Sequence, residues 1–174
     1  GTFSWQKCLG GEAGHGILVL SPKSVERINT YNPPWPIPKL FQLRKNGKLN
    51  LDIFSGATIN TPSMLCVEDF LDALNWTREV GGLSALISKS KNNLNIIKNW
   101  ISDSHWADFL CEDVNNLSST SICLKLVDPK IIDLPLETKN NIEKNIVKLL
   151  EDHKVAFDIG SYRSAPPGFR IWGG

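Results

Sequence analysis

Apolar residues alternate with polar ones in some stretches of the chain and recur every three to four residues in others. The first pattern is typical of strands and the second of helices. In the first third of the chain, the pattern predicts a strand at residues 17–20, a helix at residues 22–29 that starts at Ser21-Pro22, and a hairpin of residues 40–43 and 49–54 around Asn46-Gly47. Four prolines within residues 30–38 predict an extended linker before the hairpin.

Two longer helices are predicted next. The first has Thr61 as N-cap and Pro62 as its first residue and ends at Gly81-Gly82, and the second covers residues 83–101. Apolar residues at helical spacing predict the buried faces, which are Leu65, Phe70, Leu71 and Leu74 in the first helix and Leu83, Leu86, Ile87, Leu94, Ile97 and Ile101 in the second.

The order of elements changes after about residue 104. Strands are predicted at residues 109–111, 121–127, 155–159 and 169–172, with a helix at residues 137–152 between the two pairs. Ile142, Ile146, Val147, Leu149 and Leu150 are expected to face inward from that helix. This order predicts a compact α+β unit.

Composition and charge exclude several function classes. The chain has 174 residues, of which 41% are hydrophobic, enough for a packed core. Its 19 basic and 18 acidic side chains give a net charge of +1, which argues against nucleic-acid binding. No apolar run approaches the roughly 18 residues of a membrane span. The first residue is not Met, which indicates a fragment.

The cysteines and histidines form no pattern that binds a metal. Four cysteines occur without C-x-x-C spacing, and His15, His105 and His153 lie far apart in the sequence. We therefore expect no metal site and interpret the cysteines as reduced thiols of a cytosolic protein.

Lys7 is the first residue with candidate chemistry. It precedes a segment with glycines at positions 10, 11, 14 and 16. A lysine in a tight, partly buried turn loses its proton more readily than an exposed one and becomes a Schiff-base nucleophile. The alternative is an ordinary solvated lysine. The glycines do not form a Walker phosphate loop, because no Gly-Lys-Ser/Thr follows them.

Two further segments are candidates for anion binding. Asn60 and Thr61 precede a predicted helix, whose unpaired N–H groups favour an anion, although from this motif alone a simple helix cap is the more common explanation. Arg163 and Arg170 flank a Pro-Pro-Gly turn, and Arg170 lies in an apolar strand. A guanidinium in such a place holds a carboxylate or phosphate ligand, or forms an internal salt bridge.

Taken together, these motifs resemble those of the phosphoserine aminotransferase family, in the class V group of fold-type-I pyridoxal-phosphate enzymes. The resemblance covers essentially the whole chain. It rests on four motifs in the same order: Ser-Trp-Gln-Lys at residues 4–7, Gly-Gly-Glu-Ala-Gly-His-Gly at 10–16, Thr-Ile-Asn-Thr-Pro-Ser-Met at 58–64, and Tyr-Arg-Ser-Ala-Pro-Pro-Gly-Phe-Arg-Ile-Trp at 162–172. Many members have His-Arg where this chain has Tyr162-Arg163.

The resemblance implies an α/β and α+β fold. Residues 1–103 would be the tail of the large cofactor-binding domain, and residues 104–174 most of the small C-terminal domain, incomplete at its end. It implies a cytoplasmic homodimer in serine biosynthesis that transfers the amino group between L-glutamate and 3-phosphohydroxypyruvate. The fragment alone is expected to be inactive.

The same resemblance implies the role of each candidate residue. Lys7 would carry the cofactor pyridoxal 5'-phosphate, and Gln6 would line its pocket. Asn60 and Thr61 would reach the cofactor phosphate of the neighbouring subunit. Arg170 would bind the substrate α-carboxylate, and Arg163 the substrate phosphate. The alternatives are an alanine– or serine–glyoxylate aminotransferase and a non-catalytic dimerisation fragment.

Overall fold

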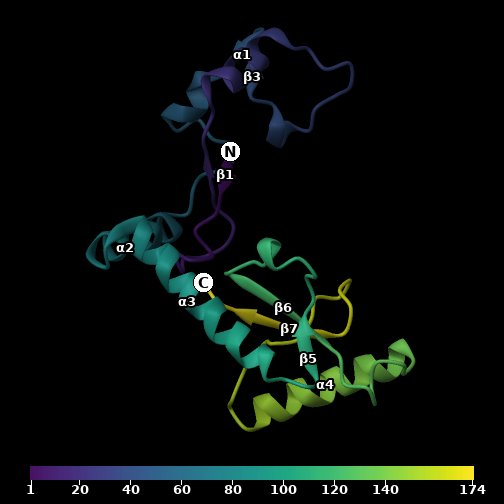
Figure 1. The fold of residues 1–174 in the computed structure, drawn as a ribbon. Coiled ribbons are helices and arrows are strands. Elements are labelled where there is room, and N and C mark those ends of the chain that lie inside the picture. Colours follow the sequence, from purple (N-terminus) through teal and green to yellow (C-terminus); the bar gives the residue numbers. More distant parts are fainter. The chain divides into compact units, whose positions relative to one another are not determined.

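A computed structural model describes residues 1–174 and divides them into two compact units, Gly1–Trp76 and Thr77–Gly174 (Figure 1). The first unit contains strands β1 (Thr2–Phe3), β2 (Ile17–Leu18), β3 (Arg44–Lys45) and β4 (Lys48–Leu49), helix α1 (Pro22–Thr30), two short 3-10 turns (Lys39–Phe41 and Leu51–Ser55) and most of helix α2 (Met64–Glu79). The second contains helices α3 (Gly82–Ser102) and α4 (Leu136–Asp152), a 3-10 turn (Val114–Asn116) and strands β5 (Ala107–Phe109), β6 (Ser121–Leu126) and β7 (Gly168–Trp172).

Local signals determine α1 and the hairpin that follows it. The Ser21 side chain accepts a hydrogen bond from the Ser24 N–H, and Pro22 is the first helical residue, as predicted. Asn46 and Gly47 both have positive φ, 51° and 79°, which is the backbone that a tight β3–β4 turn requires. The strands are shorter than predicted, because both flanks form 3-10 turns.

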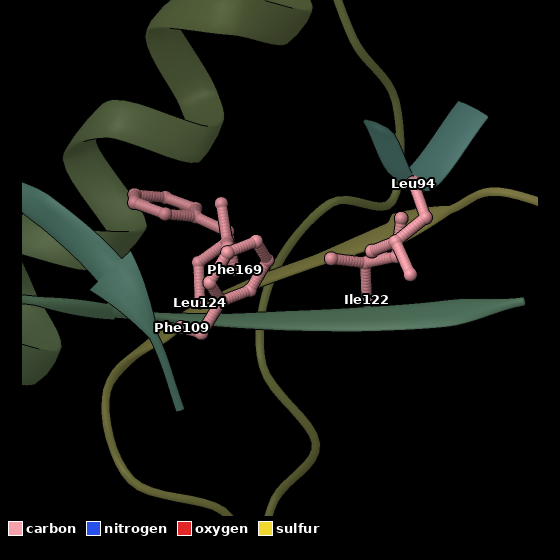
Figure 2. Packing of buried hydrophobic residues seen from close by; sticks show 5 residues of the cluster. All are labelled: Leu94, Phe109, Ile122, Leu124 and Phe169. Atoms are coloured by element: carbon pink, nitrogen blue, oxygen red, sulfur yellow. The ribbon is translucent and has the colours of Figure 1, made fainter. Parts of the chain in front are cut away.

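The core of the second unit lies on one face of a three-stranded antiparallel sheet. β6 is the central strand, and Leu124 faces Phe109 on β5 and Phe169 on β7. These side chains form a buried cluster with Ile122 and with Leu94 from α3 (Figure 2). Ile146 and Val147 of α4 pack against the same cluster, so both helices contribute to one core. The mixed helix-and-sheet fold confirms the predicted fold class.

Several predicted details were wrong. Residues 155–159 form no strand, because Lys154 and Asp158 adopt left-handed backbone (φ 56° and 50°) and interrupt the extended chain. Side chains predicted to face inward are instead exposed, since no element of this chain covers them; they are Leu65, Leu71, Leu83, Ile87 and Leu149. The predicted domain division after residue 103 stays a prediction, and the boundary between the two compact units falls after Trp76, within the sequence of α2.

Candidate active site

Lys7 lies in a loop that is closed by the pairing of β1 with β2. Within this loop, residues 4–16, the Gly10 N–H donates to the Lys7 carbonyl at 2.8 Å and the Gly11 N–H donates to the Trp5 carbonyl at 2.9 Å. Gly10 has φ of 71°, a left-handed conformation that suits glycine. Lys7 and Gln6 are half-buried beside this turn. The structure therefore places Lys7 in the tight turn predicted from the sequence.

An aromatic stack holds this loop against α2. Trp5 is 4% exposed and stacks on Phe70, with ring centroids 4.4 Å apart and planes 15° apart. The His15 ring lies on Trp5 as well, with centroids 5.9 Å apart. A side chain at Gly11 would collide with the Trp5 ring, so the loop packs this closely only with glycine there. Such offset stacking adds to the free energy gained by burial.

Two hydrogen bonds strengthen the attachment to α2. The Glu12 N–H donates to Asp69 Oδ2 at 2.9 Å, and the Ser63 N–H donates to His15 Nε2 at 3.1 Å. Because Nε2 accepts, the neutral imidazole carries its proton on Nδ1, which is buried without a partner. His15 thus connects the Lys7 loop to the residue two positions after Thr61.

Asn60 and Thr61 lie in the segment just before α2 and are exposed. The prediction that Thr61 caps the helix was wrong. α2 begins at Met64, and Ser63 occupies the capping position, with its hydroxyl accepting from the Cys66 N–H at 3.4 Å. Pro62 and Ser63 stay outside the helix, so α2 starts two residues later than the Thr61-Pro62 signal predicts. Asn60 and Thr61 therefore lie in the irregular segment before α2 and not in its first turn.

Arg170 is held by two residues of the second unit, Asp158 and Tyr162. It lies in β7, its side chain is 17% exposed, and its Nη2 donates to Asp158 Oδ2 at 3.1 Å and to the Asp158 carbonyl at 3.3 Å. Its guanidinium also lies over the Tyr162 ring, 4.1 Å from the centroid. The internal salt bridge considered as an alternative is therefore present. Since Asp158 itself is 94% exposed, this carboxylate is easily displaced by another.

Arg163 lies in the loop that precedes β7. It is exposed and follows Tyr162, so the two arginines are connected through the residue on which Arg170 packs. The Ala165 N–H donates to the Tyr162 carbonyl at 2.9 Å, which makes a tight turn around Arg163. Arg163 borders an open cavity of about 510 Å³ that Lys144 and Lys148 also line. Glu143 and Glu151 line the cavity as well, and Lys148 is paired with Asp152 at 2.7 Å, so the cavity is lined by charges of both signs.

Sequence reasoning missed His15 and Glu143. His15 was interpreted as an isolated histidine, although the glycines on both sides indicate a backbone that packs closely. Glu143 is 7% exposed and accepts hydrogen bonds from the loop that bears Arg163. The signal for its burial was present, because Glu143 and Val147 are four residues apart and share one face of α4.

Comparison with known proteins shows which class of protein this chain is similar to. The chain is 51% identical over 173 residues to phosphoserine aminotransferase of Methanosarcina mazei, a match that covers 99% of the chain and 44% of that relative. Its structure resembles those of phosphoserine aminotransferases from Bacillus circulans subsp. alkalophilus (TM-score 0.54, 23% identity, 70% of this chain and 30% of that one) and Trichomonas vaginalis (TM-score 0.55, 16% identity, 70% and 31%). No protein-family model matches the chain.

The chain is therefore a homologue of aminotransferases. More specifically, its relatives are phosphoserine aminotransferases, and the resemblance seen in the motifs, including the match to the C-terminal part of these proteins, is confirmed. The chain spans less than half the length of the Methanosarcina relative. None of its helices has the length and apolar character needed to cross a membrane.

Proposed function

We propose that the protein acts as a pyridoxal-phosphate-dependent phosphoserine aminotransferase that transfers the amino group between L-glutamate and 3-phosphohydroxypyruvate, giving O-phospho-L-serine and 2-oxoglutarate. The observation that carries this proposal is the similarity to the Methanosarcina enzyme along 99% of the chain, which includes all the candidate residues. A reaction of serine biosynthesis would take place in the cytoplasm.

The donor set of the first unit fits the cofactor. Lys7 offers a primary amine on a tight turn, which suits an aldehyde, and the Trichomonas relative is described as bound to pyridoxal phosphate. Asn60 and Thr61 offer an amide and a hydroxyl, both exposed, next to the start of α2, where N–H groups favour a phosphate. Gln6 would line the same pocket. Because Asn60 and Thr61 would serve a neighbouring subunit, we propose a homodimer.

Each residue then has a distinct task in the reaction. Pyridoxal phosphate supplies an aldehyde that condenses with amines and a ring that takes up electrons. Lys7 Nζ would hold the cofactor through this aldehyde and, when free, would accept the proton from the substrate α-carbon. Arg170 would bind the α-carboxylate in place of Asp158 and so orient the substrate. Arg163 binds the substrate phosphate.

Arginine variants of the full-length enzyme test the substrate class. Arg170→Ala should impair every amino-acid substrate, because all of them share the α-carboxylate. Arg163→Ala should impair phosphoserine far more than a substrate without phosphate. Losing a charge-assisted contact to a desolvated anion costs on the order of 2–4 kcal/mol, or about thirty- to a thousandfold in kcat/KM. Arg78→Ala, an exposed position on α2, is the control.

The outcomes separate the alternatives. Equal losses for phosphorylated and unphosphorylated substrates in Arg163→Ala would remove the phosphate assignment and favour a glyoxylate-type aminotransferase. If the 174 residues are expressed alone, we expect little transamination, because they match only 44% of the length of the Methanosarcina relative and attachment of the cofactor through Lys7 is reversible. Full activity of that polypeptide would contradict this part of the proposal.

A further inference from the structure

Glu143 is a buried acidic residue that lies outside the proposed chemistry. It is in the middle of α4 and is 7% exposed. A carboxylate buried this far from water costs free energy unless hydrogen bonds compensate for its lost hydration. An apolar side chain at this position would pack without that cost, so the contacts of the carboxylate indicate what it does.

Both carboxylate oxygens accept hydrogen bonds from a single loop. Oε1 accepts from the Ser161 N–H at 2.8 Å and from the Ser161 hydroxyl at 2.8 Å. Oε2 accepts from the Gly168 N–H at 3.2 Å. These donors are uncharged, and two of them are backbone N–H groups, so the hydrogen bonds form only when the backbone of this loop has the conformation seen here. One side chain therefore holds the first and last residues of the segment 161–168.

That segment carries one of the two arginines assigned to the substrate and the ring that supports the other. Arg163 lies within it, and Tyr162 supports Arg170. The far end of the segment is also fixed, because a side chain at Gly168 would collide with the Leu124 carbonyl of the neighbouring strand. The segment is thus attached to α4 at both ends and to β6 at one end, whereas Arg163 between them is exposed.

We propose that Glu143 is a positioning residue that holds the loop of Arg163 in the conformation in which it binds its ligand. This inference rests on the proposed function, since the ligand of Arg163 is taken to be the substrate phosphate. Glu143 acts on Arg163 through its hydrogen bonds to Ser161 and Gly168. Without it the loop is tethered mainly by β7 and by the Tyr162–Ala165 turn, and Arg163 samples many positions.

Limited proteolysis of the 174-residue chain tests the attachment directly. Trypsin cleaves after arginine, and Arg163 is followed by Ser164. Glu143→Gln keeps the size of the side chain but turns one acceptor into an NH₂ group that faces an N–H donor. Cleavage after Arg163 should become about tenfold faster in this variant, since a lost buried hydrogen bond favours local opening. Glu137→Gln, an exposed change on the same helix, should leave the rate unchanged.

Cleavage after Lys98 in α3 reports unfolding of the whole unit. The proposal requires faster cleavage after Arg163 while Lys98 stays protected, and an unchanged rate after Arg163 overturns it. If Glu143→Gln also exposes Lys98, Ser161→Ala decides the question, because it removes only the hydroxyl bond to Oε1. About threefold faster cleavage after Arg163 alone then supports the proposal, and no change overturns it.

Kinetics of the full-length enzyme test the consequence for the ligand. Glu143→Gln should raise KM for phosphoserine about tenfold and leave kcat and the KM for an unphosphorylated amino acid nearly unchanged. The positioning role is overturned if Glu143→Gln opens the loop without raising KM for phosphoserine more than KM for the unphosphorylated amino acid, in a case where Arg163→Ala does raise them unequally. If Arg163→Ala impairs phosphorylated and unphosphorylated substrates equally, the assignment of Arg163 to the substrate phosphate fails. The proteolysis result still decides whether Glu143 holds the loop.

Discussion

The two units bury their apolar side chains to very different extents. In Thr77–Gly174, Ile122, Leu124 and Phe169 are each no more than 4% exposed and lie in one cluster between a sheet and two helices. In Gly1–Trp76, only Trp5 and Ala73 are buried apolar residues, while large side chains such as Leu65 (76% exposed) and Trp35 (62%) face solvent. The second unit is held by burial, and the first by the Trp5 stack and by hydrogen bonds.

This difference indicates where each unit obtains its stability. Contiguous exposed apolar side chains are typical of surfaces that contact another protein. The exposed residues at the start of α2, Met64 and Leu65, directly follow the segment that we assign to a neighbouring subunit. The low burial in the first unit therefore supports the proposed homodimer, whereas the second unit has a core of its own.

The largest expected effect is a loss of stability when a buried side chain of the second unit is shortened, compared with an exposed one of the first unit. Ile122→Ala should destabilise the second unit by about 2–5 kcal/mol, because the cavity forms in a closely packed cluster. Leu65→Ala removes a side chain that is already in water and should change stability by less than about 0.5 kcal/mol. Urea unfolding followed by circular dichroism measures both. Equal effects would show that the contrast in burial does not determine stability.

The next effect concerns association. If the exposed start of α2 lies in the dimer interface, Leu65→Asp should raise the dissociation constant about ten- to a hundredfold, since it places a charge in an apolar contact. Leu149→Asp, at an exposed position on α4, is the matched control and should not alter it. Analytical ultracentrifugation gives the constant. A strict monomer at high protein concentration would contradict the homodimer.

A smaller effect tests whether polar contacts hold the first unit. His15→Phe keeps a ring beside Trp5 but removes the acceptor for the Ser63 N–H, and should cost about 1–2 kcal/mol. His15→Gln retains an acceptor at a similar reach and should recover most of that loss. Denaturation followed by tryptophan fluorescence compares them. Two variants of equal stability would assign the role of His15 to the stack alone.

The smallest effect is expected at the surface of α4. The hydrogen bond and charge of Asp152 raise the pKa of Lys148 above its ordinary value of 10.5. A raised pKa in the folded state means that the pair stabilises the fold below pH 10.5 and that this contribution is lost as pH rises through the folded value. Asp152→Asn should return the pKa of Lys148 toward 10.5, as measured by NMR titration. An unchanged pKa would contradict the assigned cause.

The sequence predicted elements that depend on neighbouring residues and failed where distant contacts decide. Ser21-Pro22 and Asn46-Gly47 act within a few residues, so α1 and the β3–β4 turn were predicted correctly. The exposure of Leu65 and Leu149 could not be predicted, because apolar periodicity indicates a face but not whether anything covers it. Residues 155–159 alternate like a strand, and the left-handed backbone of Asp158 interrupts them.

The same distinction applies to the candidate site. Lys7 and Arg170 stand in recognisable local motifs, and their positions in a tight turn and a strand agree with the sequence. The contacts of His15 with Ser63 and of Glu143 with Gly168 join residues 48 and 25 positions apart. No local pattern encodes such a pairing. The Tyr162 ring lies 4.1 Å from the Arg170 guanidinium, a contact between residues eight positions apart that the sequence analysis did not predict.

Gly168 has a consequence for how this sequence diverges over time. Its N–H is held by Glu143, and any side chain there would collide with the Leu124 carbonyl. Every missense mutation at this codon must therefore move β6 or release the loop, and purifying selection should remove it. Ser164, exposed beside Arg163, meets no such constraint and is free to drift. Homologues that keep this loop should accordingly have an invariant glycine at position 168 and a variable residue at position 164.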